Sequence, residues 1–196
     1  MNHSSRVQEL EISGAKVAIF PIKELSATNI DILIKAGSWY EPENKWGAFH
    51  FLEHMCFQGT EQFPTTREME LFKEEHAING DASTGGQNIN FRFQYPETSI
   101  RQCFTLIHEM LFQPSIPETK LAREKAVIRQ EYTDKWSSPY NRYSLACARQ
   151  LYGREHIYIR DGIGQPEHIE PLASDDLRQL HQDYFRPSRM AIGIAG

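Results

Sequence analysis

The chain is poor in cysteine, in long apolar runs and in basic charge, and each shortage excludes a class of protein. Cys56, Cys103 and Cys147 are an odd number without C-x-x-C spacing, so they make no disulfide framework and are typical of a reducing compartment. No stretch has the roughly 20 consecutive apolar residues of a membrane span, so we expect no membrane insertion. The formal net charge of −5 speaks against a nucleic-acid-binding protein, which needs a basic face.

The N-terminal stretch MNHSSRVQELEIS also lacks the usual features of an address signal. It has neither the apolar core of a secretion signal nor the arginine-rich amphipathic pattern of a transit peptide. Together with the cysteines, this stretch predicts a cytoplasmic protein.

The composition is that of an ordinary globular domain. The 196 residues are 40% hydrophobic and 24% charged, which predicts one domain, 1–196, large enough to bury a core. Strand patterns lie near both ends of the chain, with most helical patterns between them. This order predicts an α+β fold, in which a mixed or antiparallel sheet carries helices packed on one face.

The individual elements follow from local patterns. Ser13-Gly14 separates two short strand patterns and predicts a hairpin, while Ile30, Ile32 and Ile34 alternate with polar residues, as in a strand with one buried face. The other expected elements are helices at 45–57, 65–76, 97–112, 117–136 and 140–151, strands on both sides of Gly85-Gly86, a glycine-rich loop at 160–167, a helix opened by Ser174-Asp175-Asp176 and a last strand at 189–196.

The stretch AFHFLEHMCF carries three groups that are costly to bury in an otherwise apolar helix. His50, Glu53 and His54 share one face, because positions i, i+3 and i+4 of a helix lie together. Two imidazoles one turn apart can chelate one zinc ion. The glutamate between them cannot easily reach the same ion, but it can take a proton from water at the open coordination position.

A catalytic zinc needs a third protein ligand, commonly a carboxylate. Glu124 and Glu131 are seven positions apart in the helix at 117–136 and therefore share a face. Periodicity does not choose between them. Acidic residues on a long helix are usually solvated, and neighbouring Arg and Lys residues offer them partners, so the spacing alone does not establish a ligand.

Several separated segments resemble one known family in the same order along the chain. GSWYEPENKWGAFHFLEHMCFQGTEQFP, with its H-x-x-E-H pattern, resembles the N-terminal signature of the pitrilysin-type (M16, inverzincin) zinc peptidases. REKAVIRQEY resembles the downstream helix of that family with its two glutamates. The segment from IGQPEHIEP to the last residue resembles the end of the family's first α+β domain.

The resemblance implies a role for each residue of the motif. His50, His54 and Glu131 would be the zinc ligands and Glu53 the general base, whereas Glu124 would support the site without binding the metal. It also implies that one zinc ion is bound per chain.

The resemblance further implies a peptide-binding strand. Asp81, Ala82, Ser83 and Thr84 occupy the place of the family's N-A-x-T segment, an edge strand whose backbone pairs with an extended peptide. Asp81 stands where the family usually has Asn. The negative charge would disfavour acidic substrate residues, or the carboxylate would approach the metal without binding it. The alternative is that Asp81 is a turn residue with no part in catalysis.

The expected function is therefore that of a zinc-dependent endopeptidase domain. Family enzymes have a second α+β domain, which supplies an Arg and a Tyr with no counterpart here, so a second domain or partner subunit, or self-association, is expected. One alternative is a non-catalytic substrate-binding or assembly subunit. Another is a structural zinc, although such sites are usually rich in cysteine.

Overall fold

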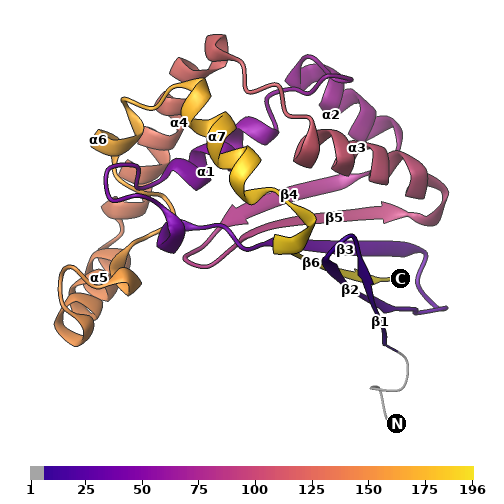
Figure 1. Ribbon diagram of the computed structural model, residues 1–196, viewed down its shortest axis with the longest axis horizontal. Coiled ribbons are helices and arrows are strands. Elements are labelled where there is room, and N and C mark those ends of the chain that lie inside the picture. Colours follow the sequence, from indigo (N-terminus) through magenta and orange to yellow (C-terminus); the bar gives the residue numbers. More distant parts are fainter. Residues whose placement is uncertain (1–6) are drawn as a thin grey trace.

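The computed structural model describes residues 7–196 and shows a six-stranded sheet with helices above one face (Figure 1). Met1–Arg6, on which the expectation about address signals partly rests, lie outside the described residues. The strands are β1 (Gln8–Ile12), β2 (Ala15–Phe20), β3 (Ala27–Ile34), β4 (Asn79–Thr84), β5 (Ile89–Pro96) and β6 (Met190–Ala195). The helices are α1 (Ala48–Cys56), α2 (Thr66–Glu75), α3 (Ile100–Phe112), α4 (Glu118–Ser137), α5 (Pro139–Tyr152), α6 (Pro166–Ile169) and α7 (Ser174–Tyr184).

The sheet is mixed, with the strand order β1-β2-β6-β3-β5-β4. β6 lies parallel to β2 and antiparallel to β3, so the end of the described chain enters the middle of the sheet. Among the strands of the described chain, β4 pairs only with β5 and forms one edge of the sheet. The predicted α+β class, with a mixed sheet and helices on one face, is confirmed.

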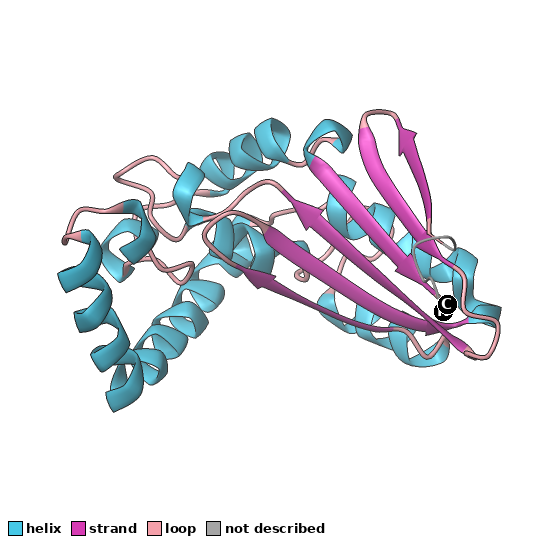
Figure 2. Cartoon of the chain, turned by 90° about the horizontal axis from the view of Figure 1, so that it is seen from below, coloured by secondary structure: helices cyan, strands magenta, loops and turns pink. Residues whose placement is uncertain are grey.

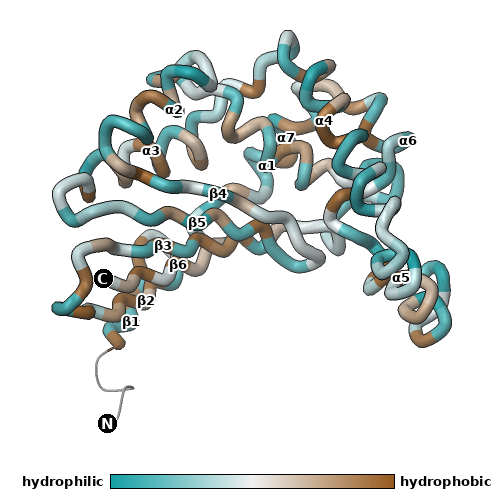
Figure 3. Tube along the Cα trace, turned by 180° about the vertical axis from the view of Figure 1, so that it is seen from behind, coloured by the Kyte–Doolittle hydropathy of each residue, from teal (hydrophilic) through white to brown (hydrophobic). Residues whose placement is uncertain are grey.

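The sheet has one covered and one open face, which Figure 2 shows from below. Ile30, Ile32 and Ile34 of β3 are at most 2% exposed, whereas Asp31 and Leu33 point away from the helices and are exposed. The hydropathy of the chain changes accordingly between brown and teal along the strands and helices in Figure 3. The alternation predicted from the sequence is therefore the alternation of the two sheet faces.

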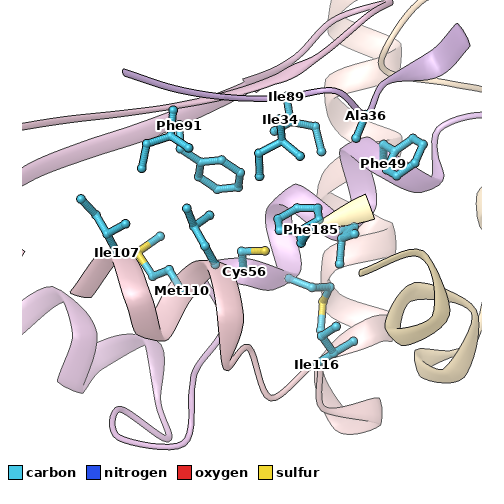
Figure 4. Close-up of a cluster of buried hydrophobic side chains, with 14 of the residues drawn as sticks. Ile34, Ala36, Phe49, Cys56, Ile89, Phe91, Ile107, Met110, Ile116 and Phe185 are labelled. Carbon is cyan, nitrogen blue, oxygen red and sulfur yellow. The ribbon is translucent and has the colours of Figure 1, made fainter. Parts of the chain in front are cut away.

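Helix α1 lies in the core between the sheet and the other helices. Phe49, Phe51, Leu52, Met55 and Cys56 are all completely buried. Figure 4 shows Phe49 and Cys56 among side chains from the sheet, from α3 and from the C-terminal part of the chain. Each fully buried large apolar side chain contributes roughly 1.5–3 kcal/mol, so α1 is held firmly against the rest of the fold.

The local signals for turns and helix ends agree with the structure, with one small difference. Ser13 and Gly14 both have positive φ in the β1–β2 hairpin, and Thr65 forms a capping box with Glu68 at the start of α2. The segment at 160–167 was predicted to be a loop throughout, but Pro166 opens the four-residue helix α6 because proline suits a first helical turn. No helix in the described part of the chain is long and apolar enough to cross a membrane.

Candidate metal centre

The two histidines of α1 turn the same ring nitrogen toward each other. His50 Nε2 and His54 Nε2 are 3.3 Å apart, and both side chains are 15% exposed at the edge of the core. The apolar residues of α1 point into the core instead. The helical spacing thus places two nitrogen donors side by side, as the sequence predicted.

Glu131 of α4 completes a group of three donors. Its Oε2 lies 3.6 Å from His50 Nε2 and 3.5 Å from His54 Nε2, and His50, His54 and Glu131 form the one described cluster suited to a metal ion. Ligand atoms about 2.0–2.2 Å from a tetrahedral zinc are roughly 3.3–3.6 Å from one another. The residues present therefore fit zinc, and the 43% exposed side chain of Glu131 leaves the site open to solvent.

Glu124 contacts the other nitrogen of His54. Its Oε2 lies 3.3 Å from His54 Nδ1, and the residue is only 5% exposed. A carboxylate at this position can accept a hydrogen bond from Nδ1–H, which leaves the lone pair of Nε2 free to bind a metal. The structure therefore places Glu131 beside the Nε2 atoms of both histidines and Glu124 beside Nδ1 of His54, a distinction that periodicity could not make.

The protonation of His50 also suits a metal ligand. Burial, reinforced by the neighbouring His54, lowers the pKa of His50 to about 3, so its imidazole is neutral at physiological pH and free to bind a metal. Its Nδ1 is buried and has no hydrogen-bond partner among residues 7–196.

Cysteine takes no part in this cluster. Cys56 follows the motif closely but is fully buried in the core, and burial raises the pKa of its thiol well above the usual range. A thiol is a poor metal ligand until it is deprotonated. The cluster of the described residues thus has three ligands and no cysteine, which is unlike a closed structural zinc site.

Glu53 is a buried residue of α1 that lies on the same helix face as the two histidines and is bound by the edge strand. The Thr84 hydroxyl donates a 2.5 Å hydrogen bond to Glu53 Oε2, and Glu53 itself is 7% exposed. Burial raises its pKa, while the hydrogen bond from Thr84 opposes this shift. A carboxylate of raised pKa is a better proton acceptor near neutral pH than an exposed one.

The segment Asp81–Thr84 forms the C-terminal part of β4 at the sheet edge. Asp81 lies within β4, opposite Arg92 of β5, and so in a strand and not in a turn. It is exposed, accepts a 3.1 Å hydrogen bond from Arg92 Nε, and is not a member of the His50, His54 and Glu131 cluster. Ala82 packs against the core from the helix-covered side. Within residues 7–196 the outer edge of β4 pairs with no other strand, so it is available for one.

The comparison with known protein families identifies the family of the chain. The family described as "Insulinase (Peptidase family M16)" matches residues 17–157. The chain belongs to peptidase family M16.

Two curated relatives of this M16 chain illustrate the similarity. It is 30% identical over 190 residues to "Coenzyme PQQ synthesis protein F" of Pseudomonas syringae pv. tomato, covering 94% of this chain and 24% of the relative. It is 25% identical over 186 residues to "Uncharacterized zinc protease YmxG" of Bacillus subtilis, covering 94% of this chain and 44% of the relative. The chain thus spans less than half the length of these relatives.

Two solved structures share the fold. The periplasmic protease PqqL of Escherichia coli superposes with a TM-score of 0.91 at 21% identity, covering 100% of this chain and 22% of that one. A peptidase M16 inactive domain from Pseudomonas fluorescens superposes with a TM-score of 0.88 at 20% identity, covering 97% and 46%. The fold alone therefore does not establish that an M16 domain is active.

Glu41 is a residue of the M16 site region for which the sequence suggested no role. Its carboxylate accepts hydrogen bonds from Gly47 N at 2.8 Å and Phe49 N at 2.7 Å, at the start of α1. Gly47 is the N-cap residue of α1 and has no side chain that could accept a hydrogen bond from the helix. Glu41 instead accepts hydrogen bonds from two amides at the start of α1 that have no partner within the helix. A helix without a Ser, Thr, Asp or Asn cap was a signal that some distant acceptor was needed, but spacing could not identify it.

The position of Glu41 predicts a pH dependence of stability. Burial raises its pKa from 4.5 to about 7, although the two amide hydrogen bonds oppose this shift. The folded chain therefore keeps a proton that the unfolded chain releases between these values, so this contribution is fully present below pH 4.5 and is lost as the pH rises through 7. In urea unfolding of the metal-free chain, the stability of wild type relative to Glu41→Gln should fall by roughly 2–3 kcal/mol between pH 4.5 and pH 8. The exposed Glu43→Gln variant serves as the control, and a pH-independent difference between wild type and Glu41→Gln would contradict this interpretation.

Proposed function

We propose that this chain is the zinc-binding domain of an M16 endopeptidase that hydrolyses extended peptides. The observation that carries the proposal is the convergence of three donor atoms, 3.3–3.6 Å apart, beside a buried carboxylate. The edge strand β4 contacts the same carboxylate, because its last residue, Thr84, donates a hydrogen bond to Glu53. The groups proposed as metal ligands, as proton acceptor and as peptide-binding edge would thus act at one place.

The residues divide the chemistry among them. His50, His54 and Glu131 would hold the ion, with Glu124 orienting His54. Zinc, when bound, would act as a Lewis acid and make water nucleophilic near neutral pH.

Glu53 would act as the proton carrier. It would accept a proton from the attacking water at Oε1, because Thr84 engages Oε2. It would then return that proton to the leaving amine.

The backbone of β4 would bind the substrate. An extended peptide can add to the free edge by main-chain hydrogen bonds, which require little of its side chains. The loop at Gly162 covers the end of this edge, since a Cβ atom on Gly162 would lie only 2.3 Å from the Thr84 carbonyl oxygen. The backbone that binds a peptide would therefore be mainly that of Asp81, Ala82 and Ser83, and Thr84 would instead position Glu53.

A variant of Thr84 tests this positioning. Thr84→Val has nearly the same shape but donates no hydrogen bond to Glu53, and a hydrogen bond to a charged group contributes about 1.5–3 kcal/mol. We expect kcat to fall about 10-fold or more, with zinc affinity unchanged. Thr105→Val, whose hydroxyl donates only to the α3 backbone, is the matched control. Unchanged kcat in Thr84→Val would show that Glu53 needs no support from β4.

The second candidate is a non-catalytic M16 domain that binds peptides or assembles with a partner. The similarity to an inactive M16 domain keeps this function in view. The complete ligand set of His50, His54 and Glu131 supports the catalytic function instead. We also propose that a second M16 domain or subunit completes the enzyme, because the curated relatives extend well beyond the matched region.

A fluorogenic peptide separates the two functions. We expect slow hydrolysis by the 196-residue chain, faster hydrolysis when a second M16 domain is supplied, and in both cases loss with a chelator and recovery with zinc. Saturable peptide binding without cleavage under all these conditions would contradict the endopeptidase and favour the binding subunit.

A further inference from the structure

The loop Arg160–Gln165, called here the bridging loop, connects the beginning of α1 with α4. Trp46, four residues before His50, donates from Nε1 to the Asp161 carbonyl oxygen at 2.7 Å. Its own carbonyl oxygen accepts a hydrogen bond from Gln165 N at 3.2 Å. The segment that leads into the metal-binding helix is therefore attached to both ends of this loop.

Two residues of α4 that follow Glu131, Tyr132 and Lys135, bind the same loop. Lys135 Nζ donates to Asp161 Oδ1 at 2.6 Å, and the two side chains are 35% and 29% exposed. Tyr132 donates from its hydroxyl to Gln165 Oε1 at 3.1 Å. Lys135 is four positions after Glu131 and thus on the same helix face.

The bridging loop fits tightly between its neighbours. A Cβ atom on Gly164 would lie 2.3 Å from Gly47 Cα, and one on Gly162 would lie 2.3 Å from the Thr84 carbonyl oxygen. Asp161 Oδ1 also accepts the amide of Ile163 at 3.1 Å, which fixes the loop internally. A loop packed this closely sets the separation of the elements on either side of it.

Glu131 depends on that separation more than the other ligands do. His50 and His54 belong to a helix buried in the core, whereas the Glu131 side chain is 43% exposed. Within residues 7–196, the ion-pair partners of the Glu131 carboxylate are His50 and His54 themselves. Its place in the cluster therefore follows from the position of α4.

We infer that the ion pair between Lys135 and Asp161 positions Glu131 for metal binding by fixing α4 to the bridging loop and, through Trp46, to α1. This inference rests on the proposed zinc site. It assigns Lys135 and Asp161 as positioning residues that do not themselves contact the metal.

Simple charge effects make a different prediction, which allows a decisive test. Lys135 and Asp161 both act electrostatically on His50, the first lowering and the second raising its pKa. If only charge mattered, removing Lys135 would strengthen the binding of a cation and removing Asp161 would weaken it. Positioning predicts that either loss weakens binding.

The experiment measures zinc affinity of the 196-residue chain by competition with a chromophoric chelator. Lys135→Met and Asp161→Asn should each weaken zinc binding about 10-fold, as is usual for residues that orient metal ligands, and the double variant should be no weaker than either. In a Glu131→Gln background, Lys135→Met should cause no further loss. Arg129→Met is the control: Arg129 also lies on α4 and forms an exposed ion pair with Glu170 outside that helix. Its loss should leave zinc affinity unchanged.

The possible results distinguish this inference from the proposed function. If wild type binds zinc and Lys135→Met binds it equally well or more tightly, the inference alone is overturned. The same holds if Lys135→Met lowers zinc affinity as much in the Glu131→Gln background as it does in wild type. No zinc binding by wild type would overturn the proposed site and the inference with it. Should Lys135→Met lower the Tm of the metal-free chain, the exchanged pair Lys135→Asp/Asp161→Lys decides. We expect it to recover most of the affinity, and a chain that folds but recovers none would overturn the inference.

Discussion

Replacing Glu53 with glutamine should abolish peptide hydrolysis and leave zinc bound. The amide keeps the shape of the side chain and can still contact Thr84, but it cannot accept the proton of the attacking water. General-base catalysis contributes about 100- to 10,000-fold, so kcat should fall by that factor or more. Peptide turnover and zinc content are measured on the same preparation, with the chain completed by a second M16 domain.

The control for this prediction is Glu75→Gln, an exposed residue at the end of α2. It should match wild type in both turnover and zinc content. Cleavage by Glu53→Gln near the wild-type rate would show that another group takes the proton. Loss of zinc together with activity would show that Glu53 supports the metal and is not specifically the base.

Glutamine at position 131 should weaken zinc binding much more than glutamine at position 124. Glu131→Gln removes the charge of a carboxylate whose Oε2 lies 3.5–3.6 Å from both histidine Nε2 atoms. If Glu131 is a zinc ligand, we expect zinc affinity to fall by more than about 100-fold. Glu124→Gln keeps a hydrogen-bond acceptor near His54 Nδ1. It should lower zinc affinity by about 10- to 100-fold, as expected for a residue that orients a metal ligand without binding the metal.

The order of the two effects decides the assignment. Both variants are titrated with zinc against the same competing chelator, and the Tm of each metal-free chain is measured to exclude unfolding. Equal losses would mean that the two carboxylates share the ion. A larger loss in Glu124→Gln would make Glu124 the ligand and contradict the arrangement described above.

The candidate site was predictable from the sequence where it depends on one helix. His50, Glu53 and His54 share a face of α1 because of their spacing alone, and the structure brings the two histidine nitrogens to 3.3 Å. Glu124 and Glu131 share a face of α4 for the same reason, so spacing could not separate them. What separates them is the way α4 lies on α1, which depends on packing between residues far apart in the chain.

The supporting residues were not predictable for a related reason. Glu41 reaches the start of α1 from outside the helix, and Asp161 meets Lys135 across 26 positions. Such contacts leave no periodic signal. Only the missing cap at Gly47 and the glycines of the bridging loop indicated that these segments were constrained.

The fold was predictable in its elements but not in its strand order. Alternation identified β3, the turn at Gly85-Gly86 indicated β4 and β5, and the turn at Ser13-Gly14 identified the first hairpin. Nothing local indicated that β6, at the other end of the chain, lies between β2 and β3. Strand pairing at this sequence distance is determined by burial of the whole sheet and not by the residues of one strand.

Zinc-edge anomalous diffraction from crystals of the chain grown with one equivalent of zinc tests the central claim most directly. We predict one strong anomalous peak, about 2.0–2.2 Å from His50 Nε2, His54 Nε2 and a Glu131 carboxylate oxygen. Glu124 should remain on His54 Nδ1. A peak that lacks Glu131, a peak at another cluster, or no peak where zinc is present in solution would contradict the account.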